Sequence, residues 1–140
     1  MATMSEQAED LRLKDAKVLI VDDDQDVLDT MIHAFRAEGA NTLKCMDGNT
    51  AVRLCDTEKP DIIILDMMLP KRSGFLVLER IRAGEVNPIV IMVTANEGKR
   101  HQQYAEALGV EGYMLKPVRL ERLITLSQEL IEKRDDDESE

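Results

Sequence analysis

Short apolar runs at four places divide the chain into a regular pattern. The runs are rich in β-branched residues and too short for helices, which predicts β-strands. The first three lack polar alternation, so we expect them to be buried on both faces, as in a parallel sheet. A fifth strand candidate, residues 41–45, mixes polar and apolar positions and is expected at a sheet edge. The four runs cover residues 18–21, 62–65, 89–93 and 113–115.

Helical periodicity fills the segments that follow these strands. Apolar positions that share one face predict helices within 27–39, 51–59, 73–84, 104–109 and 120–131. Asp24 and Ser73 are candidate N-caps, and Ser127 falls on the apolar face of the last helix. Strand and helix therefore alternate five times. With right-handed crossovers, this predicts an α/β fold, a doubly wound parallel five-stranded sheet with helices on both faces.

The charge is unevenly distributed along the 140 residues, which carry 28 acidic and 18 basic side chains and a net charge of −10. The acidic ends predict an N-terminal extension at 1–14, one folded domain at 15–134 and a disordered acidic tail at 135–140. The acidic balance and an aromatic content of 3% argue against direct nucleic acid binding. We find no membrane span and no secretory signal, and therefore expect a cytoplasmic protein.

Polar side chains follow four of the predicted strands at the point where each strand ends. Asp22 and Asp23 follow the first, Asp66 the third, Thr94 the fourth and Lys116 the fifth. The ligand site of an open α/β sheet lies beyond the carboxyl ends of its strands, so these groups should converge on one rim. Clustered carboxylates favour a hard divalent cation such as Mg²⁺. One carboxylate could then act as a nucleophile that accepts a phosphoryl group, with Thr94 and Lys116 contacting its oxygens.

Four motifs carry a resemblance to a known family. They are VLIVDDD (18–24), DIIILDMMLPKRSG (61–74), VTA (93–95) and GYMLKP (112–117). From about Lys17 to Arg134 the chain resembles the receiver domain of bacterial two-component response regulators. The resemblance implies a flavodoxin-like (βα)5 fold with strand order 2-1-3-4-5. It also implies a switch, capable of its own phosphorylation and dephosphorylation, rather than an enzyme.

The resemblance assigns a role to each residue of the acidic cluster. Asp66 corresponds to the phosphoacceptor. Asp22 and Asp23 correspond to the acidic pair, with Asp23 the more direct ligand of Mg²⁺, for which Mn²⁺ is expected to substitute. Asp66 and the backbone carbonyl of Met68 would complete the protein ligands of the metal.

Further residues correspond to the family's switch and phosphoryl-binding positions. Thr94 matches the switch hydroxyl, Lys116 the family's lysine and Tyr113 the aromatic switch residue. In such domains the Lys-Pro peptide is commonly cis, which makes Pro117 a cis-peptide candidate. Phosphorylation would repack the surface formed by the fourth helix, fifth strand and fifth helix.

The resemblance also implies partners. A sensor histidine kinase or a histidine phosphotransferase would donate the phosphoryl group, and a downstream protein would bind the switched surface or continue a phosphorelay. Residues 97–133 could mediate homodimerisation. The sequence as given is interpreted as a stand-alone receiver, with a domain of a longer regulator as the alternative.

Two other functions compete with this interpretation. The first is a pseudo-receiver, an interaction module that works without phosphorylation. The second is a phosphatase of the haloacid-dehalogenase type, whose D-x-D motif fits residues 22–24, but that motif leaves Asp66 unexplained. Cys45 and Cys55 are interpreted as small core residues, and His33 and His101 lack partners at metal-ligand spacing.

Overall fold

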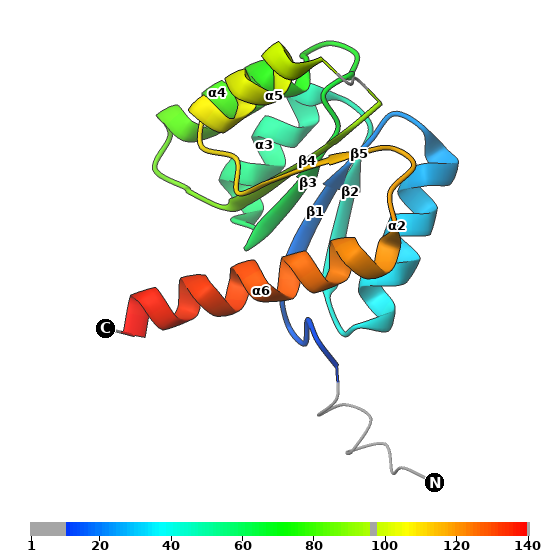
Figure 1. The fold of residues 1–140 in the computed structure, drawn as a ribbon, viewed down its shortest axis with the longest axis vertical. Coiled ribbons are helices and arrows are strands. Elements are labelled where there is room, and N and C mark those ends of the chain that lie inside the picture. Colours follow the sequence, from blue (N-terminus) through cyan, green and yellow to red (C-terminus); the bar gives the residue numbers. More distant parts are fainter. Residues whose placement is uncertain (1–10, 96–97, 140) are drawn as a thin grey trace, which may run out of the picture.

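The computed structural model describes residues 11–95 and 98–139. Most of the predicted N-terminal extension, and Glu97 at the start of the range considered for dimerisation, lie outside these residues. In the described part of the chain, strands and helices alternate as the apolar pattern predicted (Figure 1). The elements are β1 (Lys17–Val21), α2 (Gln25–Ala37), β2 (Asn41–Cys45), α3 (Gly48–Glu58), β3 (Ile62–Leu65), α4 (Gly74–Ala83), β4 (Ile89–Thr94), α5 (Lys99–Ala107), β5 (Gly112–Leu115) and α6 (Leu120–Ser139).

The strands form one parallel sheet in the order β2-β1-β3-β4-β5, which confirms the predicted fold class. β1, β3 and β4 lie inside the sheet, where both faces are covered, and this explains their unbroken apolar sequences. β2 is an edge strand with a mixed burial pattern, as expected. Val21 is paired with Leu65, and Leu65 with Met92, so these strands end together at one rim of the sheet.

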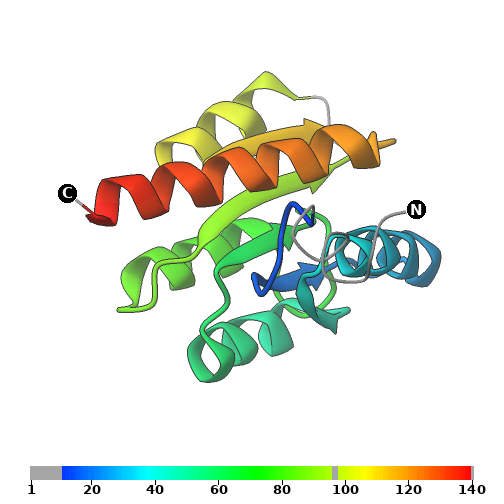
Figure 2. The ribbon, with the colours of Figure 1, turned by 90° about the horizontal axis from the view of Figure 1, so that it is seen from below.

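Two apolar cores lie on opposite faces of the sheet. α2 and α6 cover one face, which Figure 2 views, and α3, α4 and α5 cover the other. Phe35 and Leu123 are fully buried in the first core, and Leu78 is fully buried in the second. Ser127 is buried beside the first core, where its hydroxyl donates to the carbonyl of Leu123 at 2.8 Å. Along residues 11–95 and 98–139, no helix combines the length and apolar composition that crossing a membrane requires.

Side-chain caps begin two of the helices that lead away from the rim where the strands end. Asp24 accepts hydrogen bonds from the backbone N–H groups of Asp26 and Val27 at the start of α2. Ser73 accepts from the N–H of Leu76 at the start of α4. Both residues were expected to be N-caps, and each fixes the point where its loop becomes a helix.

The acidic C-terminal segment differs from its prediction as a disordered tail. α6 continues to Ser139 and takes in most of the segment. Arg134 pairs with Asp61 at 3.2 Å and with Asp135 at 3.0 Å, which ties this part of the helix to the start of β3. A helix nucleated by packed upstream turns gains one hydrogen bond per added residue. Composition alone does not take account of this local gain.

The start of the folded domain also differs from its prediction. Leu13 is only 3% exposed and Ala16 is 8% exposed, and both belong to the core on the α2 and α6 side. Leu13, inside the range predicted as an extension, is therefore packed into the core of the domain. Composition does not predict the burial of Leu13, because its neighbours are polar and a single buried leucine gives no periodic signal.

Candidate functional site

The loop after β1 places two carboxylates at the rim. Asp22 is fully buried, and its backbone N–H donates to the carbonyl of Cys45 at 3.2 Å. Its Oδ1 accepts from the N–H of Asp24 at 2.9 Å, which fixes the orientation of the carboxylate. Asp23 is exposed on the same turn. The carboxylate of Asp22 is therefore fixed and buried, while that of Asp23 faces solvent.

The loop after β3 holds Asp66 in a second rigid position. Its N–H donates to the carbonyl of Val21 at 3.0 Å, and its Oδ1 accepts from the N–H of Met68 at 3.1 Å. The loop then folds back closely, because the N–H of Gly74 donates to the carbonyl of Met67 at 2.8 Å. A Cβ atom at Gly74 would lie 2.4 Å from the carbonyl oxygen of Asp66, so this approach requires glycine.

The three carboxylates of Asp22, Asp23 and Asp66 have ligand oxygens within 4.8 Å of one another. They bring only oxygen donors, and the exposed position of Asp23 leaves room for water, which suits Mg²⁺. Oδ2 of Asp22 is buried without an aligned hydrogen bond, although it forms an ion pair with Lys116. Buried polar atoms rarely lack a hydrogen bond, so this oxygen fits the role of a ligand to a cation. The donor set is therefore compatible with the expected metal.

Lys116 projects from the end of β5 into the carboxylate cluster. Its ammonium lies 2.7 Å from Oδ2 of Asp22 and 3.1 Å from Oδ2 of Asp66. The backbone N–H of Lys116 donates to the carbonyl of Thr94 at 2.9 Å, and the peptide bond between Lys116 and Pro117 is cis. Burial works to lower the pKa of Lys116, but the contacts with the negative charges of Asp22 and Asp66 outweigh it and raise the pKa above its ordinary value. The ammonium is therefore held in its charged form.

Asp66 has a raised pKa in spite of this cation. Burial is the main cause, and the nearby charge of Asp22 acts in the same direction. The hydrogen bonds from Met68 and Lys116 lower the pKa but do not offset burial. A buried carboxylate with a raised pKa beside a fixed ammonium is typical of groups that do chemistry, because its charged form is poorly solvated.

The remaining predicted residues lie around this cluster. Thr94 is fully buried at the end of β4, beside Leu115 of β5 in the sheet register. The side chain of Met68 is 61% exposed at the rim. Tyr113 is half-buried and packs against the second core, where burial raises its pKa. The structure brings Asp22, Asp23, Asp66 and Lys116 into one cluster and places Tyr113 on β5, apart from it.

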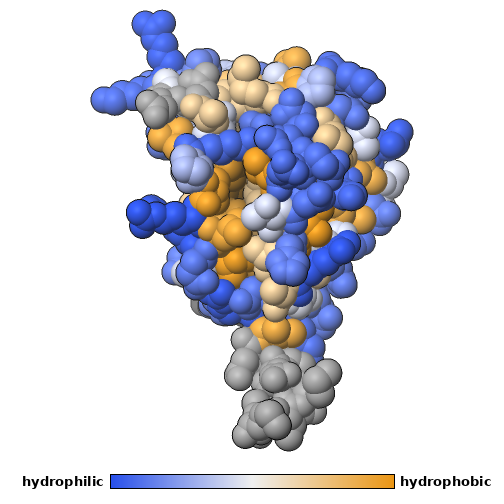
Figure 3. Space-filling model, turned by 90° about the vertical axis from the view of Figure 1, so that its right-hand side faces the viewer, coloured by the Kyte–Doolittle hydropathy of each residue, from blue (hydrophilic) through white to orange (hydrophobic). Residues whose placement is uncertain are grey.

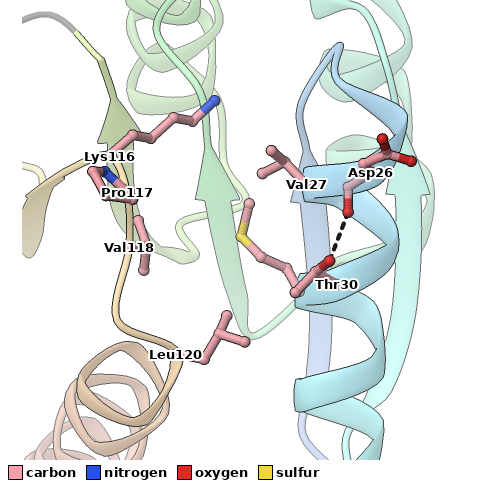
Figure 4. Close-up of a pocket in the computed structure, with 8 residues that line it drawn as sticks. Asp26, Val27, Thr30, Lys116, Pro117, Val118 and Leu120 are labelled. Atoms are coloured by element: carbon pink, nitrogen blue, oxygen red, sulfur yellow. Dashed lines mark hydrogen bonds between the residues drawn. The ribbon is translucent and has the colours of Figure 1, made fainter.

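A cavity beside Lys116 was not anticipated from the sequence. It has a volume of about 540 Å³ and lies between α2 and the loop that joins β5 to α6. Figure 3 shows apolar side chains gathered in a hollow on this side of the molecule, and Figure 4 shows Lys116 at one end of the cavity. Val27, an apolar residue in the first turn of α2, is half-buried at this cavity, and its sequence position alone indicates only a helix face. The lining residues are Asp26, Val27, Thr30, Met31, Lys116, Pro117, Val118 and Leu120.

Comparison with known families agrees with this geometry. The family model of the response regulator receiver domain matches residues 18–128. The alkaline phosphatase synthesis transcriptional regulatory protein PhoP of Bacillus subtilis (strain 168) is 33% identical over 101 residues. This match covers 72% of the present chain but only 42% of that protein, so the matched part is less than half of its length.

Solved structures give the same result. The signal receiver domain described as that of a Luxo repressor protein from Vibrio parahaemolyticus superposes with a TM-score of 0.82 and 29% identity, covering 89% of this chain and 95% of that one. CheY in the CheX–CheY–BeF3–Mg complex from Borrelia burgdorferi superposes with a TM-score of 0.78 and 26% identity, covering 82% of this chain and 88% of that one.

Proposed function

This chain belongs to the response regulator receiver domain family, and from that premise we propose that it is a switch controlled by phosphorylation of Asp66. Receiver domains of this family generally act as switches rather than as enzymes with a released product. The observation that carries the proposal is the position of Lys116. Its ammonium contacts Asp66 and Asp22, which follow two different strands, and thus marks the place where negative charge gathers.

Asp66 is the proposed acceptor because its carboxylate is fixed and lies beside that ammonium. An oxygen of Asp66 attacks the phosphorus of a phosphohistidine, and an oxygen–phosphorus bond forms as the nitrogen–phosphorus bond breaks. The leaving imidazole nitrogen keeps the electron pair and takes up a proton. The product is an acyl phosphate on Asp66, and its added charge is balanced in part by Lys116.

Asp22, Asp23 and Asp66 are the residues that would hold Mg²⁺, together with the backbone carbonyl of Met68. Their mutual repulsion and the buried oxygen of Asp22 support this assignment. When bound there, Mg²⁺ would neutralise charge on the phosphoryl oxygens. The ion in the Borrelia burgdorferi complex is consistent with such a site, and Mn²⁺ is expected to substitute.

Thr94 and Tyr113 are proposed to carry the signal from Asp66 to the surface. Thr94 ends β4 and is linked through its carbonyl to the N–H of Lys116, so a shift at either residue reaches β5. Tyr113 lies two residues into β5 and borders hollows formed with α5 and α6. We propose that the surface of α5, β5 and α6 binds a downstream protein in the phosphorylated state. The same surface is the proposed site of any homodimer.

The partner that donates the phosphoryl group is proposed to be a histidine kinase or a histidine phosphotransferase. Receiver domains interact with such kinases and with other proteins, as the complex of CheY with CheX illustrates for another member.

Labelling with a small phosphodonor tests the proposal. The protein is incubated with Mg²⁺ and acetyl phosphate, and its intact mass is measured. We expect a phosphoryl adduct that disappears with EDTA and in Asp66→Asn, whereas Asp56→Asn, on the exposed face of α3, should label normally. No adduct under conditions in which another receiver domain labels would contradict the proposal and favour a pseudo-receiver.

A further inference from the structure

The segment that precedes β1 is fixed to the turn that follows α2. The N–H of Leu13 donates to the carbonyl of Glu38 at 2.9 Å, and that of Asp15 donates to Gly39 at 3.1 Å. Gly39 has a φ of +87°, and a Cβ atom there would lie 2.9 Å from Cδ1 of Leu11. The segment before β1 is therefore held to the turn after α2 by two backbone hydrogen bonds and by close packing of Leu11 on Gly39.

Arg12 extends from this segment and reaches two carboxylates, one in the turn after α2 and one on α6. Toward α2, its Nη2 lies 2.7 Å from Oε1 of Glu38, and its backbone N–H donates to Oε2 at 3.1 Å. Toward α6, its guanidinium donates to both oxygens of Glu121, with Nη2 at 3.0 Å from Oε2. Nη1 also lies 3.5 Å from the hydroxyl of Thr125. We call Arg12, Glu38 and Glu121 the Arg12 latch.

The two arms of the Arg12 latch differ in their exposure to solvent. The side chain of Glu38 is 20% exposed and that of Arg12 is 27% exposed, whereas that of Glu121 is 76% exposed. Arg12 lowers the pKa of both carboxyl groups, and so both are charged at neutral pH. An exposed ion pair is weak and is screened by salt, while a shielded pair with backbone hydrogen bonds persists. The Glu38 arm is therefore the anchor, and the Glu121 arm is the one that can open.

The arm that can open holds the part of α6 nearest the phosphoryl site. Glu121 lies in the first turn of α6, next to Leu120, which lines the cavity beside Lys116 (Figure 4). Residues 117–119 alone separate Lys116 from this turn. A change in the position of the first turn of α6 would therefore move the wall of that cavity and the chain that leads to Lys116.

We propose that the Arg12 latch ties the N-terminal segment to the first turn of α6 and resists movement of that turn when Asp66 is phosphorylated. This inference rests on the proposed function, since it concerns the response of α6 to the phosphoryl site. Release of Glu121 favours the phosphorylated arrangement. A protein that binds the N-terminal segment and withdraws Arg12 would act in the same direction.

Hydrogen exchange of the resting protein tests the restraint. Glu121→Gln should speed exchange of the amides in residues 123–126 about twofold to fivefold, the range expected for loss of an exposed ion pair. Glu129→Gln, at an exposed position of the same helix, is the matched control and should leave these amides unchanged. In an Arg12→Gln background, Glu121→Gln should have no further effect. An equal effect in both backgrounds would overturn the latch, because it would reflect only the loss of a favourable charge at the helix start.

Binding of beryllium fluoride with Mg²⁺, a non-covalent mimic of the phosphoryl group, tests the coupling to Asp66. Glu121→Gln should bind this mimic about twofold to fivefold more tightly than the wild-type protein, and Glu129→Gln should bind equally. Equal binding by Glu121→Gln would overturn the coupling even if exchange is faster. Failure of the wild-type protein to bind would instead contradict the proposed function, while the exchange result would still decide whether the latch restrains α6.

Discussion

Replacement of Lys116 by methionine should expose the electrostatic conflict at the site. Methionine keeps the length and apolar stem of the side chain but removes the ammonium that lies 2.7 Å from Asp22 and 3.1 Å from Asp66. Asp22 is fully buried and Asp66 is 4% exposed, so water cannot replace the lost cation freely. We expect a less stable protein that depends more strongly on divalent cations.

The magnitude follows from distance and burial. At an effective dielectric constant of about 20, each contact corresponds to a charge attraction of about 5 to 6 kcal/mol before desolvation. Desolvation cancels most of this gain, and removal of one partner from a buried pair typically costs about 3–5 kcal/mol. Lys116 is 22% exposed, so some water reaches the site, and we expect a loss of about 1–3 kcal/mol.

Urea unfolding with EDTA and with Mg²⁺ measures both parts of this prediction. Lys116→Met should unfold at lower urea than the wild-type protein in EDTA, and Mg²⁺ should restore more stability to the variant than to the wild type. Lys44→Met, at an exposed position of β2, is the matched control and should show neither effect. Equal stability of Lys116→Met and wild type in EDTA, with no extra response to Mg²⁺, would refute the reasoning.

Three further predictions follow from burial and close packing. The raised pKa of Asp66 means that its charged form disfavours the folded state, so Asp66→Asn should be more stable than wild type at neutral pH. In urea titrations this gain in stability should vanish as the pH falls below the ordinary range of aspartate. Burial raises the pKa of Cys45 to about 12 and that of Cys55 to about 11. Both thiols should therefore react slowly with iodoacetamide in the native protein and rapidly in urea, as measured by mass spectrometry. Fast labelling of either thiol in the native protein would contradict this prediction. Gly74→Ala should lose about 1–3 kcal/mol of stability, because its Cβ would lie 2.4 Å from the carbonyl oxygen of Asp66, and an unchanged thermal midpoint would show that the loop yields freely.

The sheet and the rim were predictable because their signals are local in the sequence. β1, β3 and β4 lie between two layers of helices, which leaves unbroken apolar runs that no exposed strand would carry. Parallel strands end at one rim, so the residues that follow them must converge. Lys116 and Asp66 are 50 residues apart in the sequence, yet the order of elements alone brought them together.

The Arg12 latch and the end of α6 were not predictable in this way. Arg12 and Glu121 are 109 residues apart, and neither follows a strand or lies on an apolar face. Only the packing of Leu13 and the position of the turn at Gly39 bring them into contact. Composition predicted a disordered acidic end, since it does not record the ion pair of Arg134 with Asp61. Contacts between exposed charges depend on the finished fold rather than on any pattern in the sequence.

The central claim is that Asp66 accepts the phosphoryl group, and chemical trapping tests it most directly. Borohydride reduces an acyl phosphate to an alcohol and thereby converts a phosphorylated aspartate to homoserine. The protein labelled with acetyl phosphate and Mg²⁺ is reduced, digested and mapped by mass spectrometry. We predict homoserine at position 66 and aspartate at positions 22, 23 and 24. Homoserine at one of those three positions, or unmodified aspartate at position 66 in protein that carries the adduct, would contradict the account.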